Sequence, residues 1–281
     1  MKITEMSPVL EVEITAVDLS RDNEEDFEVV RRALLDHHMV VVRDQKIPPA
    51  ALIAFSRRFG AVEAHDNTRY LTDGFPEILV LSNDLQDGEP IGVPDAGDAW
   101  HSDLSFKEIP ALVTILFALR LPNRGGDTEF TNCHSAYDAL DAKMKRQLDG
   151  LRGVHTVNKL KNPRVAIAGT RQNAEEFYLA RDASVTHPLG RTHPETGRKT
   201  LYLSPRFTIA IDGMDDSEAQ PLLDEPIAHQ LDKKNRYRHK WLSGDFVMWD
   251  NRSVNHRACG RYDYADIRTI HRTTVLGDAP Y

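Results

Sequence analysis

This sequence of 281 residues has few cysteines, no long apolar runs and fewer basic than acidic residues. The two cysteines, Cys133 and Cys259, are too few for a disulfide framework, so we expect reduced thiols. No stretch approaches the roughly 18 apolar residues that a membrane-spanning helix needs. The first residues, MKITEMSPVLEVEI, include acidic side chains and no apolar segment typical of a secretory signal. These absences predict a cytoplasmic protein with no membrane partner.

The charge balance is acidic, with 35 Lys and Arg residues against 43 Asp and Glu residues and a net charge of −8. Nucleic-acid binding usually needs a basic surface, so we expect no nucleic-acid partner. A pocket for a small anion needs only a few arginines locally, whatever the global charge. Hydrophobic residues make up 41% and charged residues 28%, which is typical of a globular protein.

Strand patterns alternate with a few helical ones along the chain. Residues 23–38 carry apolar side chains at helical spacing, and residues 49–59 form a second helical stretch that ends at Gly60. Further helices are expected around residues 135–148 and 219–231. This order predicts a mainly β core with flanking helices. Strands are expected at residues 39–42, 78–81, 112–119, 201–203, 246–249 and 270–276.

One long segment has no clear periodicity. Residues 155–185 are polar and contain Asn162-Pro163 and Gly169. In a compact domain, a segment of that length is usually either disordered or an active-site lid. We interpret it as a lid inserted into a single catalytic domain that spans residues 1–281.

The tetrapeptide Trp100-His101-Ser102-Asp103 indicates a metal site. Residues two apart on an extended segment project to the same face, so His101 and Asp103 can direct an imidazole nitrogen and a carboxylate oxygen at one ion. The best candidate for a third ligand is His256, which follows a predicted buried strand. Two histidines and one carboxylate leave coordination positions open, as in Fe(II) oxygenases. A closed structural zinc site would need a fourth protein ligand.

An isolated H-x-D pattern is a weak signal, because it occurs often by chance. Its context makes it specific. Gly125-Gly126-Asp127-Thr128 follows, then the run GDFVMWDNR at residues 244–252, then His256, with Arg268 and Arg272 beyond it.

In this order the motifs resemble those of the taurine dioxygenase and 2,4-dichlorophenoxyacetate dioxygenase family of Fe(II)- and 2-oxoglutarate-dependent enzymes. The resemblance covers nearly the whole chain. It implies a double-stranded β-helix (jelly-roll, cupin-like) core, which goes beyond the strand-rich pattern itself. Its strongest pieces are WHSDLSF (100–106), PNRGGDTEF (122–130), THPLGRTHPETGRKTLYL (186–203) and GDFVMWDNRSVNH (244–256).

Carried over by position, the family's iron ligands fall on His101, Asp103 and His256. The residues that bind the distal carboxylate of 2-oxoglutarate fall on Thr128 and Arg268. An arginine grips a carboxylate through two parallel hydrogen bonds, and a hydroxyl adds one more, so the residue types suit these roles. The resemblance implies Fe(II), 2-oxoglutarate and O2 as the cofactor and cosubstrates. The implied reaction is hydroxylation of an aliphatic carbon, with release of succinate and CO2.

The family's substrate-binding positions fall on Arg272, expected to meet an anionic group, and on His65, by a looser alignment. The alternative to a substrate contact is that Arg272 forms an ion pair with Asp263 or Asp266 of the protein. The tyrosine and the asparagine that complete the taurine pocket are absent from the matching stretches here, which read Asp66-Asn67-Thr68 and Ala96-Gly97-Asp98-Ala99. We therefore expect a small anionic organic substrate, a sulfonate, sulfate or aryloxy or alkyl carboxylate, rather than taurine itself.

Two alternatives to a dioxygenase stay open on the sequence. One is a zinc-dependent hydrolase that uses the same three residues, and the other is a non-catalytic jelly-roll binding protein. Oxygen consumption that depends on 2-oxoglutarate separates the first from a dioxygenase. Ligand binding without turnover is the signature of the second. We further expect a homo-oligomer.

Overall fold

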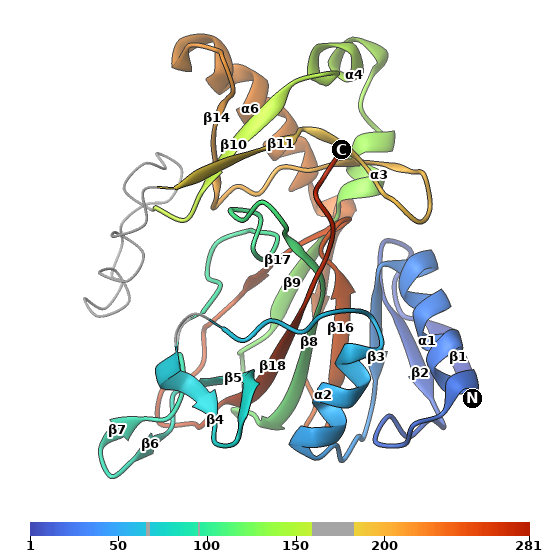
Figure 1. Cartoon of the computed structure of the whole chain (residues 1–281), viewed down its shortest axis with the longest axis vertical. Coiled ribbons are helices and arrows are strands. Elements are labelled where there is room, and N and C mark those ends of the chain that lie inside the picture. The colour runs from blue at the N-terminus through green and yellow to red at the C-terminus, as the bar shows by residue number, and fades with distance from the viewer. Residues whose placement is uncertain (66–67, 95, 159–182) are drawn as a thin grey trace.

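Strands dominate the computed structural model, which describes residues 1–65, 68–94, 96–158 and 183–281. The largest sheet has eight strands, and its neighbouring strands run antiparallel except for the parallel pair β2 and β3. In spatial order the strands are β1 (Lys2–Glu5), β2 (Val12–Thr15), β3 (Met39–Val42), β16 (Phe246–Asp250), β8 (Ala111–Arg120), β18 (Thr269–Leu276), β5 (Phe75–Ser82) and β4 (Leu71–Thr72). The long strands β8 and β18 run through its centre (Figure 1).

Two helices cover one face of this sheet (Figure 1). They are α1 (Glu24–His37) and α2 (Pro49–Arg57). Helix α1 begins at Asn23, whose side chain accepts hydrogen bonds from two backbone N–H groups of the first turn. It ends at His38, in the left-handed conformation with φ of 66°. Apolar residues of both helices pack with the sheet in one buried cluster, so the helices bury the outer face of the sheet.

A smaller sheet packs against the other face of the large one. Its order is β15 (Arg236–His239), β9 (Thr128–Asn132) and β17 (Val254–Ala258), all antiparallel. Phe130 and Val254 of this sheet join the buried cluster that also holds Trp249 and Ile270 of the large sheet. The two sheets therefore enclose a common apolar core.

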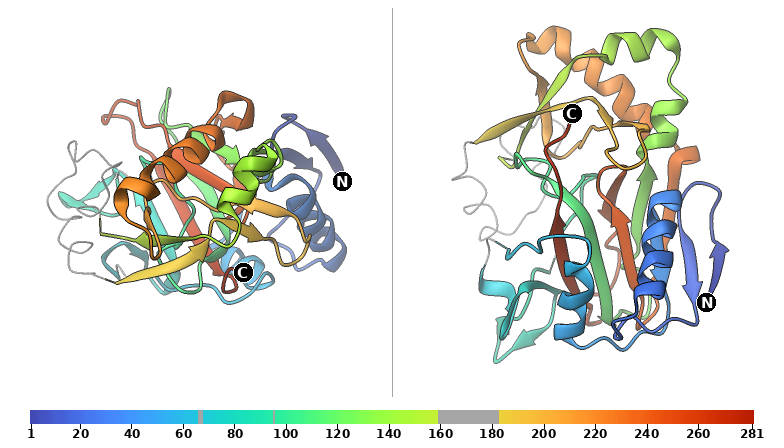
Figure 2. Two further views of the ribbon diagram at one scale, coloured as in Figure 1. Left: turned by 90° about the horizontal axis from the view of Figure 1, so that it is seen from above. Right: turned by 45° about the vertical axis from the view of Figure 1, so that its right-hand side comes forward.

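A mixed layer of helices and short strands covers one end of the two sheets (Figure 2). Its apolar residues form a third buried cluster. The helices of this layer are α3 (Cys133–Asp138), α4 (Ala142–Leu148) and α6 (Asp216–Gln230). Its strands are β10 (Arg152–Thr156), β11 (Ser184–Pro188), β12 (Gly190–Thr192), β13 (Lys199–Leu201) and β14 (Thr208–Ile211). The remaining short elements are β6 (Leu85–Gln86), β7 (Glu89–Pro90) and two turns of 3-10 helix, η1 (Thr68–Tyr70) and η3 (Lys233–Asn235).

The predicted mainly β architecture with flanking helices is confirmed, with local differences. The helix expected around residues 135–148 is two helices, because Asp141 accepts a hydrogen bond from the Met144 N–H and begins a new helix there. The strand expected at 201–203 instead ends at Leu201, as the last residue of β13. Both ends of the segment interpreted as a lid belong to strands, since β10 pairs with β11. The rest of that segment, residues 159–182, lies outside the described residues.

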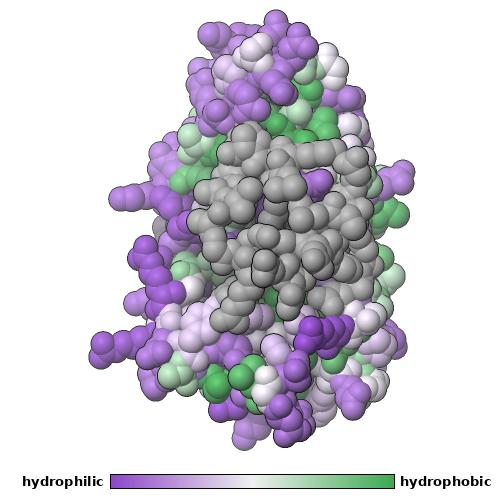
Figure 3. All heavy atoms as spheres, turned by 90° about the vertical axis from the view of Figure 1, so that its left-hand side faces the viewer, coloured by the Kyte–Doolittle hydropathy of each residue, from purple (hydrophilic) through white to green (hydrophobic). Residues whose placement is uncertain are grey.

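In the described ranges, no helix is both long enough and apolar enough to cross a membrane. On the face shown in Figure 3, the described residues are mainly hydrophilic at the upper end, and apolar groups lie between polar ones.

Candidate active site

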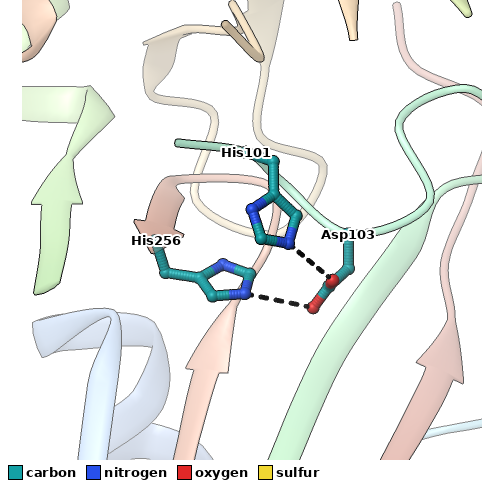
Figure 4. A group of neighbouring side chains, drawn as sticks. All are labelled: His101, Asp103 and His256. Carbon is teal, nitrogen blue, oxygen red and sulfur yellow. Dashed lines mark ion pairs between the residues drawn. The ribbon is translucent and has the colours of Figure 1, made fainter. Parts of the chain in front are cut away.

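The three predicted metal ligands meet in the structure (Figure 4). His101 and His256 form an isolated β-bridge with backbone N–H···O distances of 3.0 and 2.8 Å, which brings their side chains together. Asp103 completes the group, and one potential ligand atom from each residue lies within 4.8 Å of the others. His101 lies in a strand-like bridge as expected, whereas Asp103 already begins a turn. All three side chains are buried.

The ring nitrogens of the two histidines are placed for metal binding. The Nδ1–H group of His101 donates to the Ala99 carbonyl at 2.8 Å, and its Nε2 atom faces Asp103 Oδ1 at 3.4 Å. Burial, together with the nearby His101, lowers the pKa of His256 well below its ordinary value, so its ring is neutral. Its Nε2 atom lies 3.7 Å from Asp103 Oδ2. Both histidines therefore present a nitrogen toward the same carboxylate.

The carboxylate of Asp103 is held ionised although it is buried. Burial alone raises its pKa, but the positive charge of Arg272 offsets this, and the pKa lies well below the usual range. The Arg272 Nη2 atom lies 3.0 Å from Oδ1, and the hydroxyl of Thr114 donates to Oδ2 at 2.6 Å. Charge-assisted hydrogen bonds of this kind fix the carboxylate in one orientation.

A second layer of hydrogen bonds holds Asp103 through Asn251. The side-chain oxygen of Asn251 accepts from the Asp103 backbone N–H at 3.1 Å and from the Trp249 indole at 3.1 Å. The amide nitrogen of Asn251 donates to the Thr114 hydroxyl at 2.9 Å, whose own proton goes to Asp103. The turn between β16 and β17 therefore positions the carboxylate as well as His256.

The two residues expected to bind a distal carboxylate lie near the same end of β9 and β18. Arg268 directly precedes β18, and its Nε atom is buried without a hydrogen-bond partner. Burial lowers the pKa of its guanidinium, and among the described residues no carboxylate lies within ion-pair distance of it. A β-carbon on Gly126 would lie 3.3 Å from that Nε atom, so the arginine passes close to the chain two residues before Thr128. A buried guanidinium without a paired carboxylate among the described residues is suited to binding an anion.

Thr128, two residues after Gly126, offers a hydroxyl group. It is buried at the start of β9, and its oxygen accepts a hydrogen bond from the Trp241 indole at 3.0 Å. Its own proton is therefore available to a ligand.

Of the two residues expected to contact substrate, Arg272 lies on β18 and His65 lies on a separate segment. The protein carboxylate that pairs with Arg272 is neither Asp263 nor Asp266 but Asp103, at 3.0 Å. His65 is partly exposed and follows Glu63, whose backbone N–H donates to the Thr274 carbonyl at 2.8 Å. The segment that carries His65 is thus attached to the strand that carries Arg272.

Sequence reasoning missed Thr114 and Trp241. Thr114 is the one polar residue between Ala111 and Ala118, so a lone hydroxyl in an apolar strand was its available signal. Trp241 has no comparable signal, because its partner is 113 positions away in the sequence.

The residues that converge fit an open metal site. Two imidazoles and an ionised carboxylate are the donor set that suits Fe(II) with free coordination positions. Within the described ranges, the cluster of potential ligands contains these three residues and no fourth His, Cys, Asp or Glu. A closed four-ligand zinc site is therefore not formed by the described residues.

Comparison with known proteins places the chain in a family. The sequence model of the family described as taurine catabolism dioxygenase TauD, TfdA family, matches residues 2–274. The alpha-ketoglutarate-dependent 2,4-dichlorophenoxyacetate dioxygenase of Cupriavidus pinatubonensis is 34% identical over 261 residues, covering 89% of this chain and 88% of that protein.

Solved structures agree. A taurine dioxygenase from Burkholderia xenovorans superposes with a TM-score of 0.80 at 32% identity, over 99% of this chain and 92% of that one. The structure of AAD-2 in complex with Mn(II) and N-oxalylglycine gives a TM-score of 0.80 at 29% identity, over 99% and 98% of the two chains. The chain therefore belongs to the TauD/TfdA family, and the resemblance inferred from its motifs is confirmed. It is a 2-oxoglutarate-dependent dioxygenase that uses Fe(II) and O2.

Proposed function

We propose that His101, Asp103 and His256 hold the Fe(II) ion of this dioxygenase. The observation that carries the proposal is their convergence as two imidazoles and one ionised carboxylate, all buried, with ligand atoms within 4.8 Å of one another. Hydrogen bonds with Ala99, Thr114 and Asn251 orient these groups.

Arg268 and Thr128 are proposed to bind the distal carboxylate of 2-oxoglutarate. Support comes from the buried Arg268 Nε atom without a partner and from the Thr128 hydroxyl, whose proton is free to donate. A carboxylate bound there would neutralise the buried charge of Arg268 through charge-assisted hydrogen bonds.

The proposed reaction consumes one O2 and one 2-oxoglutarate for each substrate oxidised. One oxygen atom enters the succinate that forms as CO2 leaves, and the other enters a C–H bond of the substrate as a hydroxyl group. Bound iron supplies the activation of O2 that both halves require. The chain's own residues orient the two organic molecules at the buried triad and exclude water from it.

Arg272 is proposed to bind an anionic group on the primary substrate. Its guanidinium reaches the Asp103 carboxylate at 3.0 Å, so an anion bound by Arg272 would lie beside the metal. The oxidised carbon then lies a few bonds from that anion. A relative is named for 2,4-dichlorophenoxyacetate, a carboxylate, and a structural neighbour for taurine, a sulfonate, which supports a small anionic substrate. His65, attached through Glu63 to the same strand, is proposed as a further substrate contact.

Four broader features also stand as proposals. They are a double-stranded β-helix (jelly-roll) core formed by the two facing sheets, a single catalytic domain over residues 1–281, a cytoplasmic location and a homo-oligomeric state. The packing of β9 and β17 against β16 and β18 supports the first of them.

The direct test is oxygen consumption by the Fe(II)-loaded protein with and without 2-oxoglutarate. We expect consumption to require 2-oxoglutarate and succinate release to rise above the uncoupled rate with one member of a panel of sulfonates, sulfates, aryloxyacetates and alkyl carboxylates. Hydrolysis of an ester or amide by the zinc-loaded protein, without 2-oxoglutarate-dependent oxygen uptake, would instead support a hydrolase.

A further inference from the structure

We propose that Trp241 is a positioning residue for the cosubstrate: its indole N–H group fixes the Thr128 hydroxyl so that this hydroxyl donates to the distal carboxylate of 2-oxoglutarate. The inference rests on the proposed role of Thr128. It adds a residue from the loop after β15 to the site, and it explains why a tryptophan is buried there.

The direction of the hydrogen bond is fixed by chemistry. An indole N–H group can only donate, so Thr128 Oγ1 is the acceptor in the contact of 3.0 Å. Both residues are buried, with 9% of Trp241 and 3% of Thr128 exposed, so water does not compete for this bond. A threonine hydroxyl has one proton, and that proton points away from the indole N–H group, which occupies one of the two lone pairs of the oxygen. Among the described residues, the Thr128 hydroxyl has no acceptor for this proton.

The Arg268 Nε atom is a second donor without a partner. Arg268 Nε is buried without a partner, and it lies close to Gly126, two residues before Thr128. A carboxylate with two oxygens can accept from both groups at once. Without Trp241, the Thr128 hydroxyl would rotate freely and would have to lose that freedom whenever the ligand binds.

Trp241 is itself held rigidly. Its ring meets His239 edge to face, with centroids 4.8 Å apart and an interplanar angle of 88°. His239 lies directly opposite Thr128 in the pairing of β15 with β9. Its two ring nitrogens lie 2.9 Å from Glu11 Oε1 and 3.1 Å from Asp245 Oδ2. Burial lowers the pKa of His239, but the two carboxylates raise it by more than burial lowers it. The pKa therefore lies above its ordinary value, which favours an imidazolium that donates to both carboxylates. The platform behind the indole is therefore fixed before the ligand arrives.

The test compares two ligands on the Mn(II)-loaded protein under anaerobic conditions. The dissociation constant for 2-oxoglutarate is measured by calorimetry and divided by that for 2-oxovalerate, which has the same keto acid end and a methyl group in place of the distal carboxylate. This ratio cancels effects on the metal and on the chelating end. For Trp241→Phe we expect the ratio to increase about 3- to 10-fold, the loss of one neutral hydrogen bond.

A double-mutant cycle separates positioning from packing. Thr128→Val should increase the same ratio by a similar factor, and Trp241→Phe should add less than about 2-fold in the Thr128→Val background. Trp249→Phe is the matched control, because it also removes a buried indole N–H but on the Asn251 side, and it should leave the ratio unchanged. If Trp241→Phe does not fold, benzothienylalanine at position 241 replaces the N–H by sulfur with little change of shape.

The outcomes are distinct. Full additivity in the cycle, or an unchanged ratio in both the Trp241→Phe and benzothienylalanine proteins, would overturn the role of Trp241 while leaving that of Thr128 intact. An unchanged ratio in Thr128→Val would instead refute the proposed cosubstrate site itself.

Discussion

At the residue scale, the two oxygens of the Asp103 carboxylate have different partners, and this difference makes Thr114 a testable part of the metal site. Thr114→Val removes the hydroxyl that donates to Oδ2 at 2.6 Å and keeps the shape of the side chain. Loss of such an outer hydrogen bond typically weakens metal binding about 10- to 100-fold. We expect this loss in an anaerobic titration with Fe(II) or Mn(II).

Thr273→Val is the control for that change. Thr273 is equally buried, but its hydroxyl bonds to Ser56 and not to Asp103. This variant should lower the melting temperature and leave metal affinity unchanged. Equal metal affinity in the Thr114 variant and the wild type would contradict the role given to Thr114.

The pairing of Arg272 with Asp103 predicts that loss of the arginine affects metal binding and turnover in opposite directions. The guanidinium lies 3.0 Å from a carboxylate that is proposed to bind a dication, so it repels the ion. Arg272→Gln should therefore bind Fe(II) as tightly as the wild type or more tightly. Substrate-stimulated succinate release should fall by roughly 30-fold or more, because an anion contact worth about 2–5 kcal/mol is lost.

Arg238→Gln serves as the charge control, since Arg238 on β15 pairs with Glu129 and is partly exposed. It should retain substrate-stimulated succinate release. A structural role for Arg272 would show itself differently, by a lower melting temperature together with weakened metal and 2-oxoglutarate binding.

Individual residues differed in how far the sequence revealed them. His101, Asp103 and His256 were predicted because motif order restricts metal ligands strongly, and the structure brings them together. The partner of Arg272 was not predictable, because Asp103 is far from it in sequence and other carboxylates are nearer in sequence. Only the pairing of β18 with β8 across the sheet brings Arg272 toward Asp103.

At the element scale, the turn before β9 depends on two adjacent glycines. Gly125 and Gly126 both have positive φ, at 75° and 73°. A β-carbon on Gly125 would collide with the Arg261 carbonyl group, and one on Gly126 would press on the Arg268 side chain. The glycine pair thus lets the turn approach the arginine closely.

Gly126→Ala should consequently weaken 2-oxoglutarate binding as well as stability. Gly150→Ala is the matched control, because Gly150 has nearly the same φ of 74° with no atom near its β-carbon position. Both changes should destabilise the fold by about 1 kcal/mol or more, since alanine is strained at positive φ. Calorimetry should show weaker 2-oxoglutarate binding for the Gly126 variant alone, and equal binding by both variants would count against the placement of Arg268.

Elements with strong apolar patterns were predicted well, and those with mixed patterns were not. The strands β3, β8 and β16 contain near-continuous apolar runs because the large sheet is covered on both faces. Strands β9 (TEFTN) and β17 (VNHRA) contain few apolar residues, so neither shows a strand pattern in the sequence. Strands β10 and β11 fell within or beside a segment interpreted as one loop, because pairing between them depends on contacts distant in the chain.

At the scale of the whole molecule, buried neutral histidines predict sensitivity to acid. Burial lowers the pKa of His38 to about 3, and the pKa values of His134 and His187 to about 4. The unfolded chain binds protons at these groups below about pH 6.5, whereas the folded chain does not. Stability therefore falls as pH drops from about 6.5 toward 4, by up to about 1.4 kcal/mol per pH unit for each histidine. His239, with a raised pKa, acts in the opposite sense but is a single group.

The melting temperature of the metal-free protein should accordingly be lower at pH 5 than at pH 7. In His187→Gln an amide replaces the ring nitrogen that donates to the Lys107 carbonyl, and nothing titrates there. Its melting temperature should depend less steeply on pH. A melting temperature that does not change between pH 7 and pH 5 would be inconsistent with neutral buried histidines.

The central claim is that one buried triad holds iron while Arg268 holds 2-oxoglutarate, and anaerobic visible spectroscopy tests it most directly. The wild-type protein with Fe(II) and 2-oxoglutarate should show a metal-to-ligand charge-transfer band. His256→Ala should lose this band, and Arg268→Gln should reach it only at roughly 30-fold or more higher 2-oxoglutarate, for a lost contact of about 2–5 kcal/mol. A full band in His256→Ala at the iron and 2-oxoglutarate concentrations that saturate the wild type would contradict the account.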